Sequence, residues 1–574
     1  MSDDFSASQS VKNSRLALGV AALGFLASVV CIVVSPDGVH HFDDLTHFLY
    51  AKWAWRWPGY LLDHWGRPGF TGLYAPAAAL GWTACRILSA GLSAAAGWFA
   101  FRIAQHAGLR HAWAAVLLTW IQPLYFQLSQ TTLTETPLAF YLSAAVLLAI
   151  RGRWGWSSAM LSLCFVTRHE AVLFLPIWAA FAWFRGVSLW RLWTMLWAPV
   201  FVNTAAWSSN VTTIVELYLR PKPSGQYGTD GWFTFFARSL HAWGPAVSAL
   251  AWTGIAAFVW RRVTDRSSRT HPNGVGDPVP PSAETADATP SLALRAWTPT
   301  TFALSLTTAC IVAYFAAQTV IRVFGLFDSG GYARFLVPIG PLVGVAALAG
   351  WNGIISRDRR EQHRYVLLLA CSFILLWIAL ELQVGRHAGL DIEFPVVRGA
   401  LVAMRTTTAI LTALALLSIA FSRGTRWVLS AGIIALACIT LFIFHRPLRT
   451  PDEAPLIEGA LAELKKQGLG DRPIESALQW IDLLKGQAYP PTRGSTRSRI
   501  EQAPIGTLVA WESQFAGSHD HGLRLEEFLE SPSFRPVLET APKPFRPQPY
   551  LYIFEKVGVS PVAKSAETTV ITDE

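Results

Sequence analysis

The chain has 574 residues, of which 52% are hydrophobic and only 15% are charged, and its formal net charge is +9. A soluble domain carries about 25% charged residues, so this composition excludes an ordinary soluble protein and favours a polytopic membrane protein. Arg and Lys gather in short loops between apolar segments, which indicates a topology signal rather than a nucleic-acid-binding surface. The six cysteines are scattered without a CxxC pair and support neither a metal finger nor a disulfide framework.

Thirteen apolar segments are predicted to cross the membrane. The first, 16–34, follows a polar N-terminus and lacks a small-residue cleavage site, so we expect an uncleaved helix rather than a signal peptide. When the N-terminus is placed in the cytoplasm, every strongly basic short loop also falls on the cytoplasmic side. The predicted segments are 16–34, 84–104, 112–128, 135–150, 155–167, 171–184, 192–208, 243–260, 300–320, 334–351, 365–382, 405–422 and 427–444.

Two regions differ from this apolar pattern. Residues 264–298 are rich in Pro, Ser, Thr and Gly, which predicts a disordered cytoplasmic linker within a transmembrane catalytic domain, 1–445. Residues 446–574 form a predicted soluble extracytoplasmic domain, with a helix at 453–467 and strands at 506–511 and 550–554. The expected fold is therefore an all-α polytopic membrane protein of about 13 transmembrane helices with a small α/β C-terminal domain.

The segment HHFDDLTH, residues 40–47, places two adjacent carboxylates directly after the first apolar segment. A helix that starts near Asp43 would bring Asp43, Asp44 and His47 close together above an apolar stripe that lies along the membrane. A carboxylate in this position is suited to act as general base for an acceptor hydroxyl. The alternative is a solvated loop with a helix-capping Asp; the doublet and its position favour the catalytic interpretation.

Two more polar segments interrupt the apolar pattern on the same predicted side. In TLTETP, Glu135 opens a span with Thr134 as a candidate cap, and Glu135 could also simply complement the helix dipole. In TRHEA, Arg168, His169 and Glu170 interrupt a long apolar stretch, where a charge at mid-bilayer costs roughly 2.5–3.5 kcal/mol. These three residues therefore mark a boundary between two short helices or line a polar cavity, unless Arg168 and Glu170 form a purely structural pair.

The fourth polar segment, from Asp328 to Pro338, ends a loop and opens a span. Its Gly330-Gly331 pair predicts a flexible backbone near a turn or a ligand. Arg334 offers a planar donor fork that suits a phosphate, the alternative being a side chain that reaches outward to lipid headgroups. All four segments fall on one side of the predicted topology and indicate a site for an anionic, lipid-linked substrate and a nucleophile that must lose a proton.

By these motifs, their order and their shared side, the chain resembles the GT-C superfamily of integral-membrane glycosyltransferases, which use polyprenyl-phosphate-linked sugars. The plan is similar to the branch with protein O-mannosyltransferases and the lipid A aminoarabinose transferase, and the resemblance covers residues 16–445. It implies that Asp43 is the general base, with Asp44 as second candidate or positioning group. It further implies that the substrate-binding residues are His47, Glu135, Arg168, His169, Glu170, Tyr332 and Arg334.

The expected function is transfer of a sugar, with inversion, to a hydroxyl of a protein, lipid or glycan at the outer face of a bacterial inner membrane. No cofactor is expected; yet many superfamily members have Asp-Glu where this chain has Asp-Asp, and the neighbouring His40, His41 and His47 leave a divalent metal open. One alternative is a transporter or lipid flippase, which would need midplane charges or an inverted repeat. Others are a non-catalytic scaffold and a metal-dependent transferase that uses a diphosphate lipid.

Overall fold

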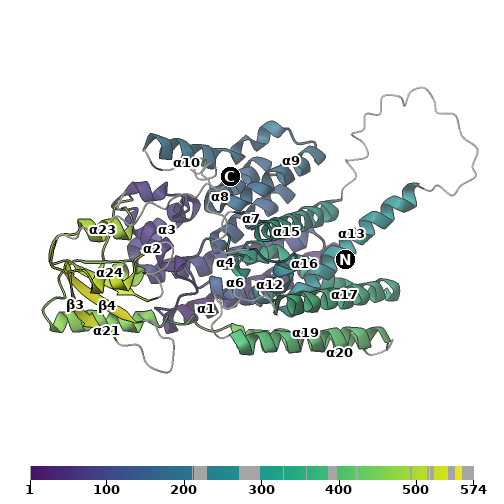
Figure 1. Cartoon of the computed structure of the whole chain (residues 1–574). Coiled ribbons are helices and arrows are strands. Elements are labelled where there is room, and N and C mark those ends of the chain that lie inside the picture. The colour runs from purple at the N-terminus through teal and green to yellow at the C-terminus, as the bar shows by residue number, and fades with distance from the viewer. Residues whose placement is uncertain are drawn as a thin grey trace, which may run out of the picture.

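The computed structural model of the protein is a bundle of helices with a small sheet at one end (Figure 1). It describes residues 2–209, 211, 229–270, 298–326, 329–356, 358–384, 397–420, 425–491, 494–513, 516, 522–540 and 550–558. Residues 271–297 of the predicted linker, and Asp328, lie outside this part of the chain. The linker's first residues, 264–270, are helical, because α13 continues through Thr270.

The first part of the helical region contains helices of very different lengths. They are α1 (Ser2–Val34), α2 (Asp43–Trp53), η1 (Pro58–Leu61), α3 (Pro68–Leu80), α4 (Trp82–His106), α5 (Ala114–Trp120), α6 (Pro123–Leu128), α7 (Glu135–Ile150), α8 (Trp154–Thr167), η2 (His169–Leu173), α9 (Phe174–Phe184), η3 (Leu189–Met195) and α10 (Trp197–Ser208). The second half of the helical region contains α12 (Thr234–Trp243), α13 (Pro245–Thr270), α15 (Pro299–Val323), η6 (Ala333–Ile339), α16 (Gly340–Ile354), α17 (Arg359–Val384), α19 (Val397–Ala420) and α20 (Thr425–Phe444).

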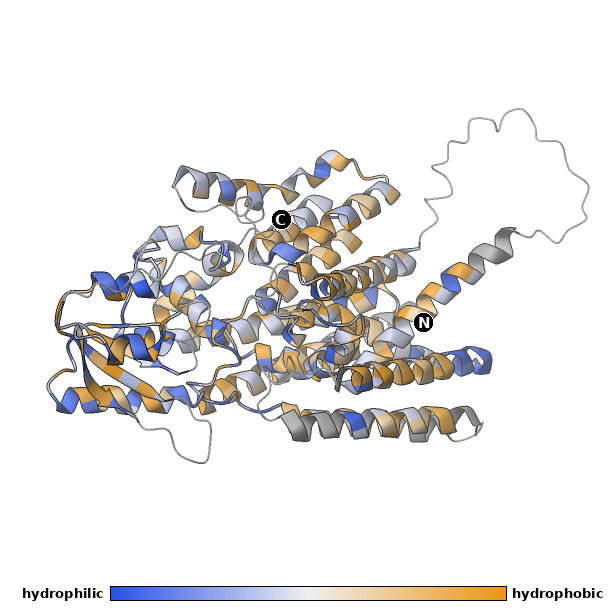
Figure 2. Cartoon of the chain, in the orientation of Figure 1, coloured by the Kyte–Doolittle hydropathy of each residue, from blue (hydrophilic) through white to orange (hydrophobic). Residues whose placement is uncertain are grey.

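Every predicted apolar segment contains helix, but fewer helices are long enough to cross a membrane alone. Within the described residues five pass by length and composition, and α12 with α13 forms a sixth candidate that bends by 118° at Gly244. Other helices are too short because the helical segment is interrupted, as between α5 and α6, where Pro123 starts a new helix. The apolar helices, whose orange stretches run through the bundle in Figure 2, make this a multi-pass membrane protein. The number thirteen stays a prediction.

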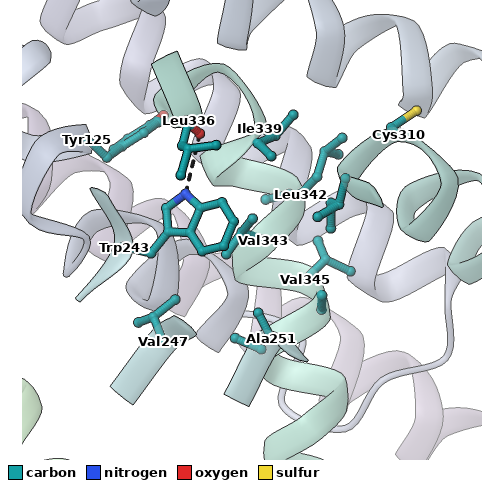
Figure 3. Packing of buried hydrophobic residues seen from close by; sticks show 14 of the residues in the cluster. Tyr125, Trp243, Val247, Ala251, Cys310, Leu336, Ile339, Leu342, Val343 and Val345 are labelled. Atoms are coloured by element: carbon teal, nitrogen blue, oxygen red, sulfur yellow. Dashed lines mark hydrogen bonds between the residues drawn. The ribbon is translucent and has the colours of Figure 1, made fainter. Parts of the chain in front are cut away.

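The centre of the bundle fixes the segment that carries Arg334. Almost all of the helical stretch 333–354 is buried inside the protein. Trp243, at the bend between α12 and α13, donates from Nε1 to the carbonyl oxygen of Leu336 at 3.3 Å, and apolar side chains of α13 and α16 pack around it (Figure 3). Gly254 and Gly350 let α13 and α16 approach closely, since a Cβ at either position would meet the other helix's backbone. η6 therefore rests on a rigid support.

The C-terminal region forms the small mixed sheet at the left of Figure 1, with strand order β1-β2-β4-β3. The predicted helix and both predicted strands are confirmed as α21, β2 and β4. Two strands were missed because β1 has three residues and β3 is an edge strand with a register shift beside Pro536. The elements are α21 (Glu453–Lys466), β1 (Ile474–Ser476), α22 (Gln479–Lys485), α23 (Thr496–Gln502), β2 (Leu508–Glu512), α24 (Leu525–Leu529), β3 (Phe534–Glu539) and β4 (Leu551–Lys556).

This region shares one hydrophobic core with α2, η1, α3 and the first part of α4. Trp480 of α22 packs edge-on against Trp82, with ring centroids 5.9 Å apart. Trp53, in the last turn of α2, donates from Nε1 to the carbonyl of Gln487 at 3.1 Å, and the Tyr60 hydroxyl donates to the carbonyl of Tyr489 at 2.7 Å. The C-terminal region thereby supports α2, whose first residue is Asp43.

Candidate functional site

The two adjacent carboxylates of α2 have different surroundings. The helix begins at Asp43, as predicted, and Asp44 is 1% exposed. Oδ2 of Asp44 accepts from the amides of His40 and His41 at 2.9 and 3.4 Å, and Oδ1 accepts from the amide of Thr132 at 3.0 Å. Burial raises the pKa of Asp44 to about 6, although these amides act to lower it. Asp44 ties the start of α2 to the segment before α7 and is not among the cavity-lining residues.

Asp43 instead faces a cavity. Its Oδ2 lies 2.8 Å from Nη2 of Arg334 and 3.1 Å from Nδ1 of His41. Burial acts to raise the pKa of Asp43, but His41 and Arg334 outweigh it and hold the pKa well below the usual range. Both contacts go to Oδ2, and no hydrogen bond or ion pair within the described part of the chain involves Oδ1. The carboxylate is thus held at one oxygen while the other is open to a substrate.

A chain of alternating charges continues from Arg334 across the cavity wall. Nε of Arg334 lies 3.6 Å from Oε1 of Glu135, which also accepts from Nη1 of Arg168 at 2.7 Å. Nη2 of Arg168 donates to Glu170 at 2.7 Å. Burial acts to raise the pKa of Glu170, but Arg168 lowers it to about 2. Thr134 makes no side-chain cap of α7; its hydroxyl lies 3.3 Å from Nη1 of Arg168.

Arg334 is 4% exposed and pairs inside the protein, so it does not have the outward-reaching position of the alternative interpretation. The Arg168–Glu170 pair does exist, but it is one link in this larger network rather than an isolated pair. The network joins residues from α2, α7, the α8–η2 junction and η6. Opposite charges from four separate segments therefore hold the wall together.

A second wall combines imidazoles with an arginine that the sequence did not single out. Nη1 of Arg67 lies 2.9 and 3.0 Å from the two ring nitrogens of His169. Burial lowers the pKa of His47 to about 3, and burial, followed by Arg67, holds the pKa of His169 well below its usual range. Both imidazoles are neutral at physiological pH and act as hydrogen-bonding groups. Arg67 has a φ of 61°, which is uncommon for a side-chain-bearing residue and often marks functional sites.

The loop Gly330-Gly331-Tyr332, called the GGY loop below, is held in place by charged side chains that pack against its backbone. Gly331 has a φ of +62°, and a Cβ there would meet Arg238 and Arg322, so the predicted turn requires this glycine. Nη1 of Arg322 donates to the carbonyl of Ser329 at 3.0 Å, and Asp230 bridges Arg238 and Arg322 at 3.2 and 2.7 Å. The backbone that leads to Tyr332 and Arg334 is therefore fixed.

These walls enclose a cavity of about 370 Å³. It gathers eight of the nine predicted site residues, all except Asp44, and also residues that the sequence analysis missed. Three carboxylates face three guanidinium groups, and the ring of Tyr332 lies 4.9 Å from Cζ of Arg334 and 5.6 Å from the ring of His41. The predicted residues that line it are Asp43, His47, Glu135, Arg168, His169, Glu170, Tyr332 and Arg334; the missed ones include His41, Trp65, Arg67 and Gln318.

Two of the missed residues gave a weak signal in the sequence. His41 was considered only as a possible metal ligand, and Arg67 lies in the stretch 55–70, whose aromatic residues by themselves indicate only a loop at the membrane interface. Among the described residues no group of three or more His, Cys, Asp or Glu side chains is arranged to hold a metal ion. The positive charge within the cavity comes from arginines.

The sequence matches no protein-family profile and no curated protein. Among solved structures, it is similar to ArnT from Cupriavidus metallidurans bound to undecaprenyl phosphate, with a TM-score of 0.52, 12% identity and coverage of 93% of this chain and 97% of that chain. The apo state of the same ArnT gives a TM-score of 0.50 at 13% identity, covering 94% of this chain and 98% of that one. The likeness extends over nearly the whole of both chains, and the chain therefore has the fold of ArnT.

Proposed function

We propose that the protein is an integral-membrane glycosyltransferase that moves a sugar from a polyprenyl-phosphate donor to an acceptor hydroxyl. The observation that carries this proposal is the contact between Asp43 and Arg334 inside a cavity lined by three arginines. A base candidate thus lies beside a phosphate-binding candidate, as the transfer reaction requires. Similarity to the fold of ArnT bound to undecaprenyl phosphate supports the same class of donor.

In this mechanism the donor phosphate binds Arg334, with Arg168 behind it, and the sugar projects toward Asp43. Oδ1 of Asp43 accepts the proton of the acceptor hydroxyl, whose oxygen bonds to the anomeric carbon on the face opposite the phosphate. The bond between the anomeric carbon and the phosphate oxygen breaks, and the configuration inverts. The phosphate leaves as an anion, so no general acid is needed, and the guanidinium groups stabilise its growing charge.

The remaining cavity residues are assigned to substrate binding. The neutral imidazoles of His47 and His169 are suited to hydrogen bonds with sugar or acceptor hydroxyls. Tyr332 offers a ring face beside Asp43's partner His41, and Glu170 offers a carboxylate that is ionised at neutral pH. We assign Asp44 to positioning, because three backbone amides already occupy its oxygens.

We place the cavity and the C-terminal domain, 446–574, outside the cytoplasm of a bacterial inner membrane. This placement is supported by the basic loops, which share one side while the cavity segments share the other. Proteins, lipids and glycans all carry acceptor hydroxyls, and both hexoses and pentoses are candidate sugars.

The test compares lipid-linked and envelope glycans from cells that carry wild-type protein, no protein, Asp43→Asn or the control Asp452→Asn, at matched expression. Asp452 is an exposed carboxylate outside the cavity, so the Asp452→Asn variant should make the same glycan as wild type. A sugar missing without the protein and with Asp43→Asn, but present with the control, supports the proposal. If Asp43→Asn restores the missing sugar, Asp43 is not the general base. No glycan difference in any strain favours the transporter or flippase alternative.

A further inference from the structure

We propose that the donor phosphate displaces Asp43 from Arg334, so that the base is released only when the donor is bound, while His41 keeps Asp43 in place. This inference rests on the proposed function and concerns the order of events within the same cavity. It gives Arg334 two successive partners and adds His41 as a positioning residue.

The first argument is the geometry of the guanidinium group. Two parallel bonds to a phosphate use two neighbouring nitrogens, either Nε with Nη2 or Nη1 with Nη2. Both edges contain Nη2, and Nη2 is the nitrogen that lies 2.8 Å from Asp43. A phosphate held by two bonds at Arg334 therefore shares Nη2 with Asp43 and competes with it for the two N–H groups of that nitrogen.

The second argument is the charge of the cavity. Asp43, Glu135 and Glu170 balance Arg67, Arg168 and Arg334 before any substrate arrives. A phosphate adds negative charge to a site in which the arginines already have carboxylate neighbours, so it competes with those carboxylates for the guanidinium groups.

The carboxylate that gives way is identified by burial. The side chain of Glu135 is 1% exposed and is held by Arg168, whereas that of Asp43 is 25% exposed. Glu170 pairs with Arg168 and not with Arg334. Asp43 is therefore the neighbour of Arg334 that can move away with the smallest desolvation cost.

The third argument concerns the base itself. The charged and titratable groups that act on Asp43 are His41, Arg334 and His47, and Glu135 lies behind Arg334. While Nη2 holds Oδ2, the carboxylate is a weak proton acceptor, because the guanidinium favours its ionised form. Removal of this contact makes Asp43 more basic at the moment when the sugar is in place. A donor-first order of binding follows.

His41 prevents the released carboxylate from turning away. Its Nδ1 lies 3.1 Å from Oδ2 and 3.2 Å from the backbone nitrogen of Asp43. A protonated Nδ1 donates to Oδ2, and an unprotonated Nδ1 accepts from the backbone N–H instead. Its ring lies beside Tyr332, within the same cavity. After Arg334 turns to the phosphate, His41 is the remaining close partner of Oδ2, and Oδ1 stays directed toward the acceptor.

The first experiment measures binding of undecaprenyl phosphate to the full-length protein in nanodiscs. Asp43→Asn should bind this lipid about tenfold more tightly than wild type, because it removes a charged competitor for Nη2. Arg334→Gln should bind it more weakly, and the control Asp452→Asn should match wild type. Should Asp43→Asn fail to fold, Asp43→Ser gives the same comparison.

The outcomes separate the two proposals. Equal or weaker binding by Asp43→Asn, with clear binding by wild type, overturns the displacement and leaves the proposed function intact. No binding of undecaprenyl phosphate by wild type counts against the donor class itself, and hence against the proposed function.

The second experiment tests His41 through the pH dependence of turnover. His41→Phe keeps a ring beside Tyr332 but has no Nδ1, so kcat should fall more than the donor KM changes, and the acid limb of kcat should shift. His41→Asn, whose side-chain amide replaces Nδ1–H, should restore part of kcat and the original limb. Loss of activity in both variants with an unchanged pH profile would mean that His41 is merely structural.

Discussion

Nη2 of Arg334 and Oδ2 of Asp43 lie 2.8 Å apart, although 291 residues separate them along the chain. One residue opens a short helix after the first apolar segment, and the other lies on η6 at the buried centre of the bundle. Their contact places a carboxylate and a guanidinium group at one cavity wall. It also means that neither residue can be changed without altering the electrostatics of the other.

Asp43→Asn and Asp44→Asn should fail in different ways. Asp43→Asn should lower kcat by roughly 10²–10⁴-fold, as loss of a general base does, with little change in the unfolding temperature. Asp44→Asn should destabilise the protein by about 1.5–3 kcal/mol, because its amide nitrogen would face backbone donors. Turnover assays and thermal unfolding of the two purified variants check this, and the reverse pattern would exchange the assigned roles.

Arg168→Met should be one of the most destabilising single changes in the cavity wall. It leaves Glu135 and Glu170 buried or half-buried without their shared partner, at a cost of about 3–5 kcal/mol. Arg449→Met is the control, because its pair with Asp452 is exposed and a surface pair contributes about 0–1 kcal/mol. Thermal unfolding measures both; similar losses in the two variants would contradict a buried network.

The acid limb of kcat/KM for the donor should lie below the usual carboxyl range. The pKa of Asp43 is lowered in the free protein, so the base stays ionised until the pH falls through that lowered value. The same shift contributes stability that is present above the unfolded pKa of about 3.9 and is lost as the pH falls through the folded pKa. Arg334→Gln should move the limb to higher pH. An unmoved limb would mean that another group titrates.

Gly331→Ala should reduce donor binding. The new Cβ would meet Arg238 and Arg322 at a backbone with positive φ, so the loop that leads to Arg334 must shift. Gly72→Ala is the matched control, since a Cβ there meets nothing within 4 Å. Binding of undecaprenyl phosphate should fall in the first variant only. Equal affinity in both would separate the GGY loop from the phosphate site.

Trp480→Ala should affect activity from outside the cavity. It removes a fully buried side chain that packs on Trp82, at a cost of about 3–5 kcal/mol. Because α22 and α2 belong to the same core, kcat should fall together with stability. Leu529→Ala, at a half-exposed position of α24, should change neither. Retained turnover in a destabilised Trp480→Ala would show that α2 is positioned without the C-terminal region.

Hydropathy predicted the helical segments well but not their lengths. Helix formation depends on local patterns of apolar residues, which a sequence displays directly. Whether a helix is long enough to cross the membrane alone depends on breaks such as Pro123 and the bend at Gly244. The short edge strands β1 and β3 were missed for a related reason, because their pairing is supplied by distant residues.

The sequence alone determined that this is a mostly helical membrane protein, that a helix starts near Asp43, and which segments interrupt the apolar pattern with charged residues. Composition and local periodicity contain that information, because each is a property of consecutive residues. Only the tertiary structure decided that Asp43 faces the cavity while Asp44 is enclosed by backbone amides, and that His41 and Arg67 join the site. Those distinctions arise from contacts between segments far apart in the chain, and burial and electrostatic pairing exist only once those segments are packed together.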